Sequence, residues 1–288
     1  MKKYVILSIL VLIFIASLAI YQLTIFYDGK LHVTICDVGQ GDAVFIRTPN
    51  GHTILFDGGP DQSVLKCLRS ELPFWYRRIN LILLSHPHAD HLNGLVSVFK
   101  RYRVGQFATE DLANTSEGYA ELEKVVKNEG ITWQTLLDGD RIKLDSGIVL
   151  SVVGPTQDYL MRTSGTNKII NTSEFASLEM LLTYNKFSLL LTGDSQYQEM
   201  GEMITSHKLP QITVLQEPHH GSRTGITPEI IAALHLKVST ISVGEHNSYG
   251  HPAPSTLDTL HQAGVRVHRT DKEGTLRLIS DGKSYNIK

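Results

Sequence analysis

The sequence predicts an α/β protein, built as a four-layer αββα sandwich that follows one N-terminal transmembrane helix. Three observations predict it. An uncharged run extends from Tyr4 to Tyr27. Short apolar strand patterns then occur both in hairpins and in alternation with helical patterns, and strand-rich segments open both halves of the remaining chain. The roughly 260 residues after the run contain no evident linker, so we assign 1–27 to an anchor or signal segment and 28–288 to one domain.

The N-terminal run is longer than the roughly 20 apolar residues that a bilayer requires. Lys2 and Lys3 precede it and no comparable basic cluster follows it, which places the N-terminus in the cytoplasm and the domain outside. Ser17-Leu18-Ala19 offers a signal-peptide cleavage site, so a cleaved, secreted form is the alternative. The run continues well past Ala19, which favours an uncleaved anchor. A buried helix of the domain is disfavoured, because the run is apolar on every face.

Patterns in the first half of the domain alternate between strand and helix. Pro49-Asn50-Gly51 marks a hairpin between two strands. The apolar run LILLS is bounded by polar residues, which is typical of a strand buried on both faces. We expect strands over 31–37, 43–48, 52–56 and 81–85, and helices over 62–72, 92–101 and 117–128.

The second half repeats this alternation. Asn185-Lys186 joins two apolar runs as a hairpin turn. Residues 154–171 are rich in Gly, Pro, Thr, Ser and Asn and show no period, which predicts a loop. We expect strands over 147–153, 177–184, 187–192, 212–216, 238–243, 265–269 and 275–279, and helices over 196–206, 228–236 and 254–263.

The composition excludes several classes of protein. With 27 basic and 29 acidic residues the net charge is −2, which excludes a strongly basic nucleic-acid coat but leaves room for a local basic patch. The two cysteines, Cys36 and Cys67, cannot form a four-cysteine zinc site and can form at most one bridge; we expect them to be buried thiols. The informative excess is histidine, with 13 residues.

Four histidine and aspartate side chains are concentrated in six residues, His86-Pro87-His88-Ala89-Asp90-His91, directly after the LILLS strand. The carboxyl end of a buried strand is where α/β sheets bind ligands. Imidazole and carboxylate are ligands of zinc and similar ions. Ligands at alternate positions can send His86 and His88 to one ion, while Asp90 and His91 face a neighbouring ion.

Two later segments can complete these metal shells. LLLTGD is another apolar strand that ends in a carboxylate, and its Asp194 could bridge two cations. A turn or helix-cap aspartate is the structural alternative. The strand before Pro218 leads into His219-His220-Gly221-Ser222, so a third strand also ends in candidate ligands.

The loop from His86 to His91 matches the HxHxDH motif of the metallo-β-lactamase superfamily, which the chain resembles. Asp57 in ILFDGG resembles the superfamily's early aspartate, which orders the metal loop, and Asp194 resembles its bridging aspartate. Within the superfamily, the chain resembles the hydrolase domain of ComEC-type competence proteins and their stand-alone relatives. That likeness rests on the segments 35–59, 83–95, 177–194, 218–224, 241–252 and 268–278.

The resemblance implies a four-layer αββα hydrolase with two divalent ions, Zn²⁺ first and Mn²⁺ as the alternative. By analogy with related HH motifs, His220 is the ligand and His219 lies behind it, as Asp57 does. The implied metal ligands are His86, His88, Asp90, His91, Asp194 and His220. Many members carry a further histidine before the bridging aspartate, but none lies between His91 and Asp194 here. The chain also lacks the many spans of a competence channel, so only the hydrolase module is shared.

Further polar residues suit a phosphodiester substrate. We expect Asp90 or Asp194 to orient the attacking hydroxide, and His251 or His219 to protonate the leaving oxygen. Ser222 and Asn247 could donate hydrogen bonds to a phosphate oxygen, and Arg223 is placed to meet a phosphate.

The basic run KRYR, Lys100 to Arg103, could stack a tyrosine on a base, although such a run more often ends a solvated helix.

These observations leave three candidate functions. The first is a membrane-tethered, metal-dependent phosphodiesterase acting on DNA or a phosphorylated polymer. The second is a metallo-hydrolase of a lactone, thioester or β-lactam. The third is a non-catalytic binding module with a degraded metal site.

Overall fold

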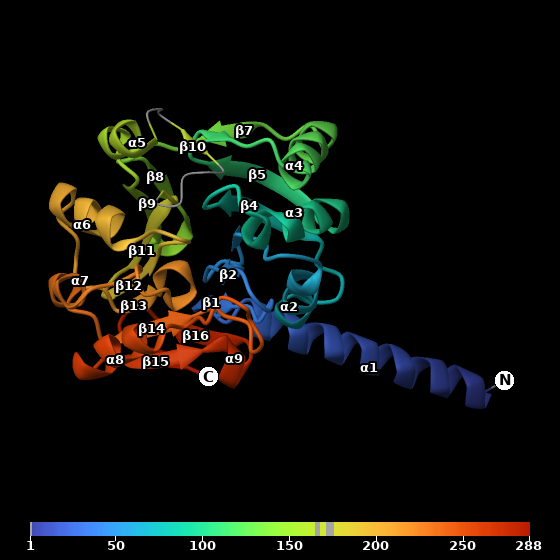
Figure 1. The fold of residues 1–288 in the computed structure, drawn as a ribbon. Coiled ribbons are helices and arrows are strands. Elements are labelled where there is room, and N and C mark those ends of the chain that lie inside the picture. The colour runs from blue at the N-terminus through green and yellow to red at the C-terminus, as the bar shows by residue number, and fades with distance from the viewer. Residues whose placement is uncertain (1, 165–167, 171–175) are drawn as a thin grey trace.

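The computed structural model describes residues 2–164, 168–170 and 176–288, and it contains two facing sheets with helices on their outer sides (Figure 1). The first sheet has the strand order β17-β16-β1-β2-β3-β4-β5-β7. Its strands are β1 (Leu31–Ile35), β2 (Val44–Arg47), β3 (Thr53–Phe56), β4 (Arg78–Leu84), β5 (Arg103–Thr109), β7 (Trp133–Thr135), β16 (Leu276–Ser280) and β17 (Tyr285–Ile287). Strands β3, β4, β5 and β7 are parallel to one another, and the remaining pairs are antiparallel.

The second sheet has the order β15-β14-β13-β12-β11-β9-β8 and likewise joins an antiparallel half to a parallel half. Its strands are β8 (Arg141–Lys143), β9 (Val149–Gly154), β11 (Glu179–Tyr184), β12 (Phe187–Leu191), β13 (Val214–Gln216), β14 (Val238–Ile241) and β15 (Arg266–Arg269). A short parallel pair, β6 (Leu112–Ala113) and β10 (Ile169–Ile170), lies apart from both sheets.

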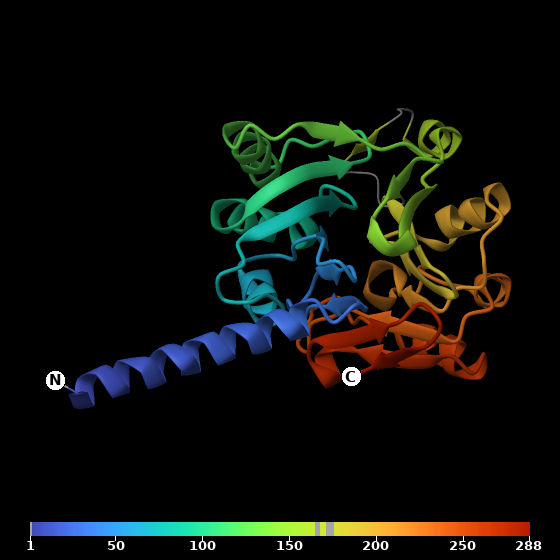
Figure 2. The same cartoon turned by 180° about the vertical axis from the view of Figure 1, so that it is seen from behind.

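Most of the helices cover the outer faces of the two sheets, whereas α1 projects away from the domain (Figures 1 and 2). The helices are α1 (Lys2–Phe26), α2 (Ser63–Glu71), α3 (Ala89–Arg101), α4 (Glu117–Asn128), α5 (Gln157–Ser164), α6 (Tyr197–Ser206), α7 (Pro228–Leu234), α8 (Pro254–Gln262) and α9 (Thr270–Glu273), with 3-10 turns η1 (Asp145–Gly147) and η2 (Pro218–Gly221). Helices α2, α3 and α4 pack on the first sheet, and α6, α7 and α8 pack on the second.

The hydrophobic core consists of three clusters, one for each interface between layers. In β4, Leu81 and Leu83 join the cluster between the two sheets, whereas Ile82 and Leu84 join the cluster beneath the first sheet's helices. Successive side chains of a strand point to opposite faces, so a strand covered on both sides needs apolar residues throughout. This explains the continuous LILL run and confirms the predicted four-layer sandwich.

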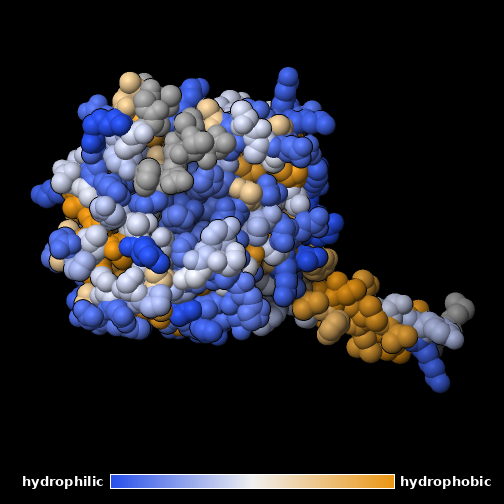
Figure 3. All heavy atoms as spheres, in the orientation of Figure 1, coloured by the Kyte–Doolittle hydropathy of each residue, from blue (hydrophilic) through white to orange (hydrophobic). Residues whose placement is uncertain are grey.

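Helix α1 projects away from the domain (Figures 1 and 3). The helix Lys3–Phe26 contains an 18-residue window with a mean hydropathy of 2.7, so it is long and apolar enough to cross a membrane. Figure 3 shows this helix as the most apolar part of the visible surface. Its last residue, Phe26, is buried against the domain. The predicted apolar helix is therefore present as a candidate membrane span.

Three expectations from the sequence are wrong. Residues 154–171 are not a simple loop, because α5 and β10 form within them; 165–167 and 171 lie outside the described residues. Strands β5, β6, β7, β8 and β17 were not expected; in β5, Gly105 and Gln106 interrupt the apolar pattern. Helix α3 begins at Ala89 rather than at Leu92, so Asp90 and His91 lie in its first turn.

The cysteines are not free thiols either, because Cys36 and Cys67 form a disulfide. Cys36 follows β1 and Cys67 lies on the buried side of α2, with 5.8 Å between their Cα atoms. Their pairing depends on how α2 packs against the strand ends, which no local pattern encodes. The bond ties the first helix of the domain to its first strand.

Reduction of this disulfide should destabilise the domain by about 3–4 kcal/mol, because the bond closes a loop between residues 31 positions apart. Thermal unfolding of the full chain in detergent, with and without a phosphine reductant, measures the effect. A Cys36→Ala/Cys67→Ala variant should unfold at the same temperature as the reduced protein, and the reductant should not change its midpoint. An unchanged midpoint in protein whose thiols titrate as fully reduced would contradict the expectation.

Candidate metal centre

The HxHxDH loop connects the carboxyl end of β4 to the first turn of α3. His86 and His91 are 1% and 0% exposed. The ring of His86 lies 4.2 Å from that of His91 and 4.4 Å from that of His88, centroid to centroid. The loop thus gathers its imidazoles at one point at the edge of the first sheet.

The turn after β12 brings Asp194 to the same point from the second sheet. Gly193 precedes it with a φ of +49°, and a Cβ there would lie 2.3 Å from Ser177 Oγ and 2.8 Å from Ser85 Cβ. Only glycine allows the Thr192–Asp194 turn to approach the HxHxDH loop this closely. The Asp194 amide also donates to Ser177 Oγ, which fixes the turn.

The third segment is the η2 turn after β13. His219 and His220 both have positive φ, 50° and 56°, which is a strained conformation for side chains of this size. The His219 amide donates to the Gly193 carbonyl, and His220 Nδ1 donates to the Ser242 carbonyl. His220 therefore directs its Nε2 towards Asp194.

One group of atoms has the spacing of a single cation's ligands. Asp194 Oδ1 lies 3.2 Å from His91 Nε2 and 3.5 Å from His220 Nε2. Asp90 Oδ2 lies 3.5 Å from His220 Nε2 and 3.9 Å from His91 Nε2. Tetrahedral ligands 2.0–2.1 Å from zinc are separated from one another by about 3.4 Å. These four atoms fit that spacing.

The other oxygen of Asp194 faces a second group. His86 Nε2 lies 3.6 Å from Asp194 Oδ2, and His219 Nε2 lies 3.7 Å from the same oxygen. His86, His88 and Asp194 also bring one ligand atom each within 4.8 Å of one another. Asp194 is thus placed to bridge two cations.

The polar atoms in this cluster lack other partners. His86 Nε2, His91 Nε2, His220 Nε2 and Asp194 Oδ1 are buried and make no hydrogen bond with any residue that the structure describes. Burial of unpaired polar atoms is costly, and ligand atoms of a metal are one of the few reasons to retain them. The donor set and its convergence fit divalent ions.

Two buried carboxylates lie behind the His91 and His220 rings. Asp57, fully buried with a φ of 60°, accepts hydrogen bonds from the Ser85 amide and hydroxyl and lies 2.9 Å from His91 Nδ1. This contact leaves His91 Nε2 for a cation, as the resemblance implies for Asp57.

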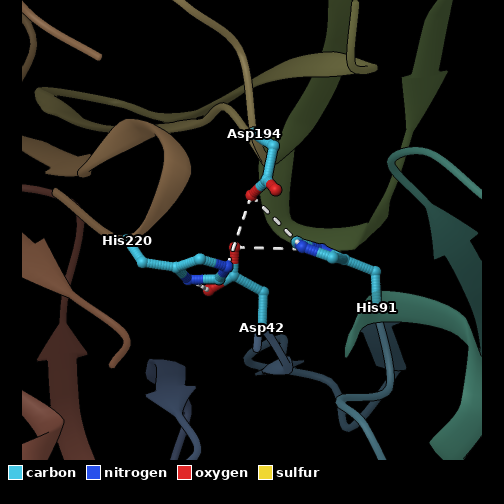
Figure 4. A group of neighbouring side chains, drawn as sticks. All are labelled: Asp42, His91, Asp194 and His220. Atoms are coloured by element: carbon cyan, nitrogen blue, oxygen red, sulfur yellow. Dashed lines mark ion pairs between the residues drawn. The ribbon is translucent and has the colours of Figure 1, made fainter. Parts of the chain in front are cut away.

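Asp42 was not among the expected site residues, because it lies between the expected strands 31–37 and 43–48. It is buried, and its Oδ2 accepts from Gln216 Nε2 at 2.6 Å. It forms a group with His91, Asp194 and His220 (Figure 4). Its oxygens lie 3.7 Å from His220 Nδ1 and 4.0 Å from His91 Nδ1, behind the rings. Burial raises the pKa of Asp42 to about 7, against the charges of His220 and His91, so Asp42 balances both imidazoles in its ionised form. The only sequence signal was an aspartate after two glycines.

The three residues expected to contact phosphate differ in the hydrogen bonds that they can still make. Asn247 uses both amide hydrogens on the carbonyls of Gly244 and His251, so it has none left for a phosphate, and that expectation is corrected. The Ser222 hydroxyl pairs with Thr224. Arg223 is exposed and close enough to His251 to affect its pKa. Of the three proposed phosphate contacts, Arg223 is the one whose side chain is still available to a phosphate.

His251 lies beside His219, with 5.5 Å between ring centroids. Burial, together with the charges of His219 and His220, lowers the pKa of His251 to about 4. Burial also lowers the pKa of His219. Both rings are therefore neutral at pH 7, and neither carries the extra proton that a general acid would give to a leaving oxygen. This argues against the acid role expected for them.

Comparison with known proteins agrees with this geometry. Residues 36–246 match the family model described as the metallo-beta-lactamase superfamily. The chain belongs to that superfamily. Its homologues include ComE operon protein 3 of Bacillus subtilis (strain 168), 24% identical over 85% of this chain and 32% of that protein. Recombination protein 2 of Haemophilus influenzae is 28% identical over 85% of this chain and 28% of that protein. The chain thus spans about a third of the length of these curated relatives.

Solved structures share the fold at low sequence identity. The metallo-beta-lactamase fold protein YhfI from Bacillus subtilis superposes with a TM-score of 0.56, at 12% identity, over 83% of this chain and 96% of that one. Zn(2+)-bound PqqB from Methylobacterium extorquens gives 0.51, at 12% identity, over 83% and 97%. These structures show the shared fold, and the family match over residues 36–246 places the chain in the superfamily.

The charged groups at the metal centre strongly shift one another's pKa values. Burial alone would raise the pKa of Asp194, but the charges of His91, His220 and His86 outweigh it and hold that pKa well below its usual range. Burial alone would lower the pKa of His220, but Asp194 and Asp42 raise it to about 9. At neutral pH the His220 ring is consequently protonated, and a cation must displace that proton.

Metal affinity should therefore rise as the pH rises from 6 towards 9, by about tenfold per pH unit for each displaced proton. Competition for Zn²⁺ against a fluorescent chelator, repeated across this range, measures the slope. A His220→Gln variant, which has no such proton to release, should bind more weakly and with a shallower slope. An affinity that is independent of pH would contradict the coupling.

Proposed function

We propose that this protein is a membrane-tethered, dinuclear phosphodiesterase of the ComEC type, acting on DNA or another phosphorylated polymer outside the membrane. One observation carries the proposal: the two oxygens of Asp194 face two separate groups of ligand atoms, at 3.2–3.7 Å. Two adjacent cations can hold the attacking and leaving oxygens of a phosphodiester together. The competence-protein homologues favour a role in DNA handling.

We assign the ligands from these distances. Asp90, His91, His220 and Asp194 would hold one ion, and His86, His88 and Asp194 the other. His219 would supply the remaining ligand of the second ion, in place of the histidine that many superfamily members carry earlier in the chain, because its Nε2 faces the same Asp194 oxygen as His86 does. Mixed nitrogen and oxygen donors suit Zn²⁺ first and Mn²⁺ as the alternative.

Bound divalent ions would supply Lewis acidity and hydroxide at neutral pH, which is the chemistry that phosphodiester hydrolysis needs. Asp90 would orient the attacking water, since the nearby charges of His91 and His220 outweigh its burial and lower its pKa. Arg223 would pair with non-bridging phosphate oxygens. His251, which is neutral and lies beside His219, would help to position the substrate. The leaving oxygen would take its proton from solvent.

We propose that residues 1–27 anchor the protein with its N-terminus in the cytoplasm and residues 28–288 outside. Lys2 and Lys3 precede the span, and a charge bias of this kind sets orientation. The Cys36–Cys67 disulfide supports the same side, because disulfides persist in oxidising compartments and are rare in the cytosol.

The role assigned to His219 predicts a change in metal content. His219→Ala should retain one tightly bound ion instead of two after desalting, because only the second group loses a ligand. Elemental analysis of the full chain in detergent measures the ratio. His261→Ala, an exposed histidine at the end of α8, is the matched control and should keep two ions. Two ions held with unchanged affinity in His219→Ala would show that His219 is not a metal ligand and lies behind the ligands instead.

The activity itself is tested with the full chain in detergent, using bis-p-nitrophenyl phosphate and single-stranded DNA, with added Zn²⁺ or Mn²⁺ and with chelator. Wild-type protein should cleave both in a metal-dependent manner, and His88→Ala should lose at least about 100-fold in rate, on the scale of removing a metal ligand or its partner. His261→Ala should cleave normally.

Other results would select other functions. Two bound ions without phosphodiester cleavage would point to a lactone, thioester or β-lactam substrate. Neither cleavage nor metal binding would indicate a binding module on this fold. Cleavage that survives in His88→Ala and in chelator would refute the proposed site.

A further inference from the structure

A basic surface lies at the opposite end of the first sheet from the metal centre. It surrounds a groove of about 850 Å³ where α3 ends and where β4 and β5 begin. We define it as the basic face, made of five exposed side chains: Arg77, Arg78, Lys100, Arg101 and Arg103. Two acids are nearby, since Lys100 pairs with Glu121 at 3.0 Å and Glu129 lines the groove. The four arginines form no ion pair with any acidic residue in the described part of the chain. The face is therefore net positive.

Two exposed aromatic side chains adjoin the basic face. Phe74 and Trp75 are 67% and 38% exposed, in the segment between α2 and β4 that continues into Arg77 and Arg78. Contact with water alone does not account for the exposure of two aromatic side chains beside basic residues. Tryptophan is enriched at membrane–water interfaces, where an apolar ring can enter the headgroup layer.

The same segment touches the end of the candidate membrane span. Tyr76 packs on Phe26, the last residue of α1, with 4.8 Å between ring centroids. Arg47 donates to the Phe26 carbonyl, lies 4.9 Å from its ring centre and pairs with Asp28 at 3.7 Å. The helix is thus joined to the domain by packed contacts rather than by a free linker.

These contacts fix which side of the domain faces the bilayer. Helix α1 leaves the domain beside α2, on the side where α3 ends (Figures 1 and 2). The ligands of the HxHxDH loop follow the other end of β4 and extend into the first turn of α3, so about 20 Å of strand and helix separates them from the basic face. A nucleic acid held on the basic face would lie away from the metal centre.

We propose that the basic face, together with Phe74 and Trp75, rests on the anionic headgroups of the bilayer that α1 spans. The proposal depends on α1 being a retained anchor and not on the phosphodiesterase activity. Because the junction is packed, the face stays within the roughly 8–10 Å over which headgroup charge acts at physiological salt. The domain would then be held in one orientation, with the metal centre turned away from the lipid.

The test uses the full chain with Trp133→Phe, which leaves Trp75 as the single tryptophan. The protein is reconstituted in brominated phosphatidylcholine vesicles, with or without 30% phosphatidylglycerol. Trp75 should be quenched at least about twofold more strongly in the anionic vesicles, and 0.5 M salt should remove the difference. Arg77→Glu/Arg101→Glu/Arg103→Glu should abolish it.

The matched control carries the same change in net charge elsewhere. Lys186, Lys237 and Lys283 are exposed around a separate groove, and their triple change to glutamate should leave the quenching unaltered. If Trp133→Phe does not fold, tryptic cleavage of the wild type at Arg77 and Arg78 serves instead, and it should be slower in anionic than in neutral vesicles.

Two results would overturn the proposal. One is equal quenching of Trp75 in neutral and anionic vesicles, or in the arginine variant and the lysine control. The other is that the arginine variant loses binding of a labelled single-stranded oligonucleotide, measured by anisotropy, while Trp75 quenching persists. The basic face would then be a nucleic-acid surface.

Discussion

The carboxylate of Asp194 is the constraint on which the rest of the centre depends. It is buried where the edges of the two sheets meet, and its two oxygens face imidazoles of His86, His91, His219 and His220. An isolated buried charge would cost several kcal/mol. Its cost is offset only if opposite charge, from protonated rings or from cations, is held within a few ångströms. The surrounding loops are arranged to provide this.

Those loops adopt conformations that their sequences would not choose alone. Asp57, His219 and His220 all have positive φ, and Gly193 brings one turn against the other with no room for a Cβ. Strain of this kind costs on the order of 1–3 kcal/mol per residue and persists only where the surroundings over-determine it. Here the three hydrophobic clusters fix the strand ends, and the strand ends fix the loops. The large core thus supports a small, strained polar centre.

The two ends of the first sheet are used differently. The carboxyl ends of β3 and β4 carry Asp57 and the HxHxDH loop, whereas the opposite end carries the arginines and the contact with Phe26. This polarity follows from the parallel arrangement of β3, β4 and β5, since their equivalent ends must lie on one edge. The candidate metal centre and the contact with Phe26 of α1 are therefore separated by the length of a strand.

The sequence by itself determined the layers, most strands and the metal loop, because these depend on local apolar period and on ligands close together in the chain. It could also place Asp57, Asp194 and His220 through a family resemblance. Only the tertiary structure decided that Asp42 lies behind His91 and His220. It also decided that both amide hydrogens of Asn247 bond to carbonyls of its own loop. The disulfide between Cys36 and Cys67 likewise depends on tertiary packing. The tertiary structure also brought His219 to the oxygen that faces His86. Each of these depends on segments far apart in the chain, which meet only because the two sheets pack face to face.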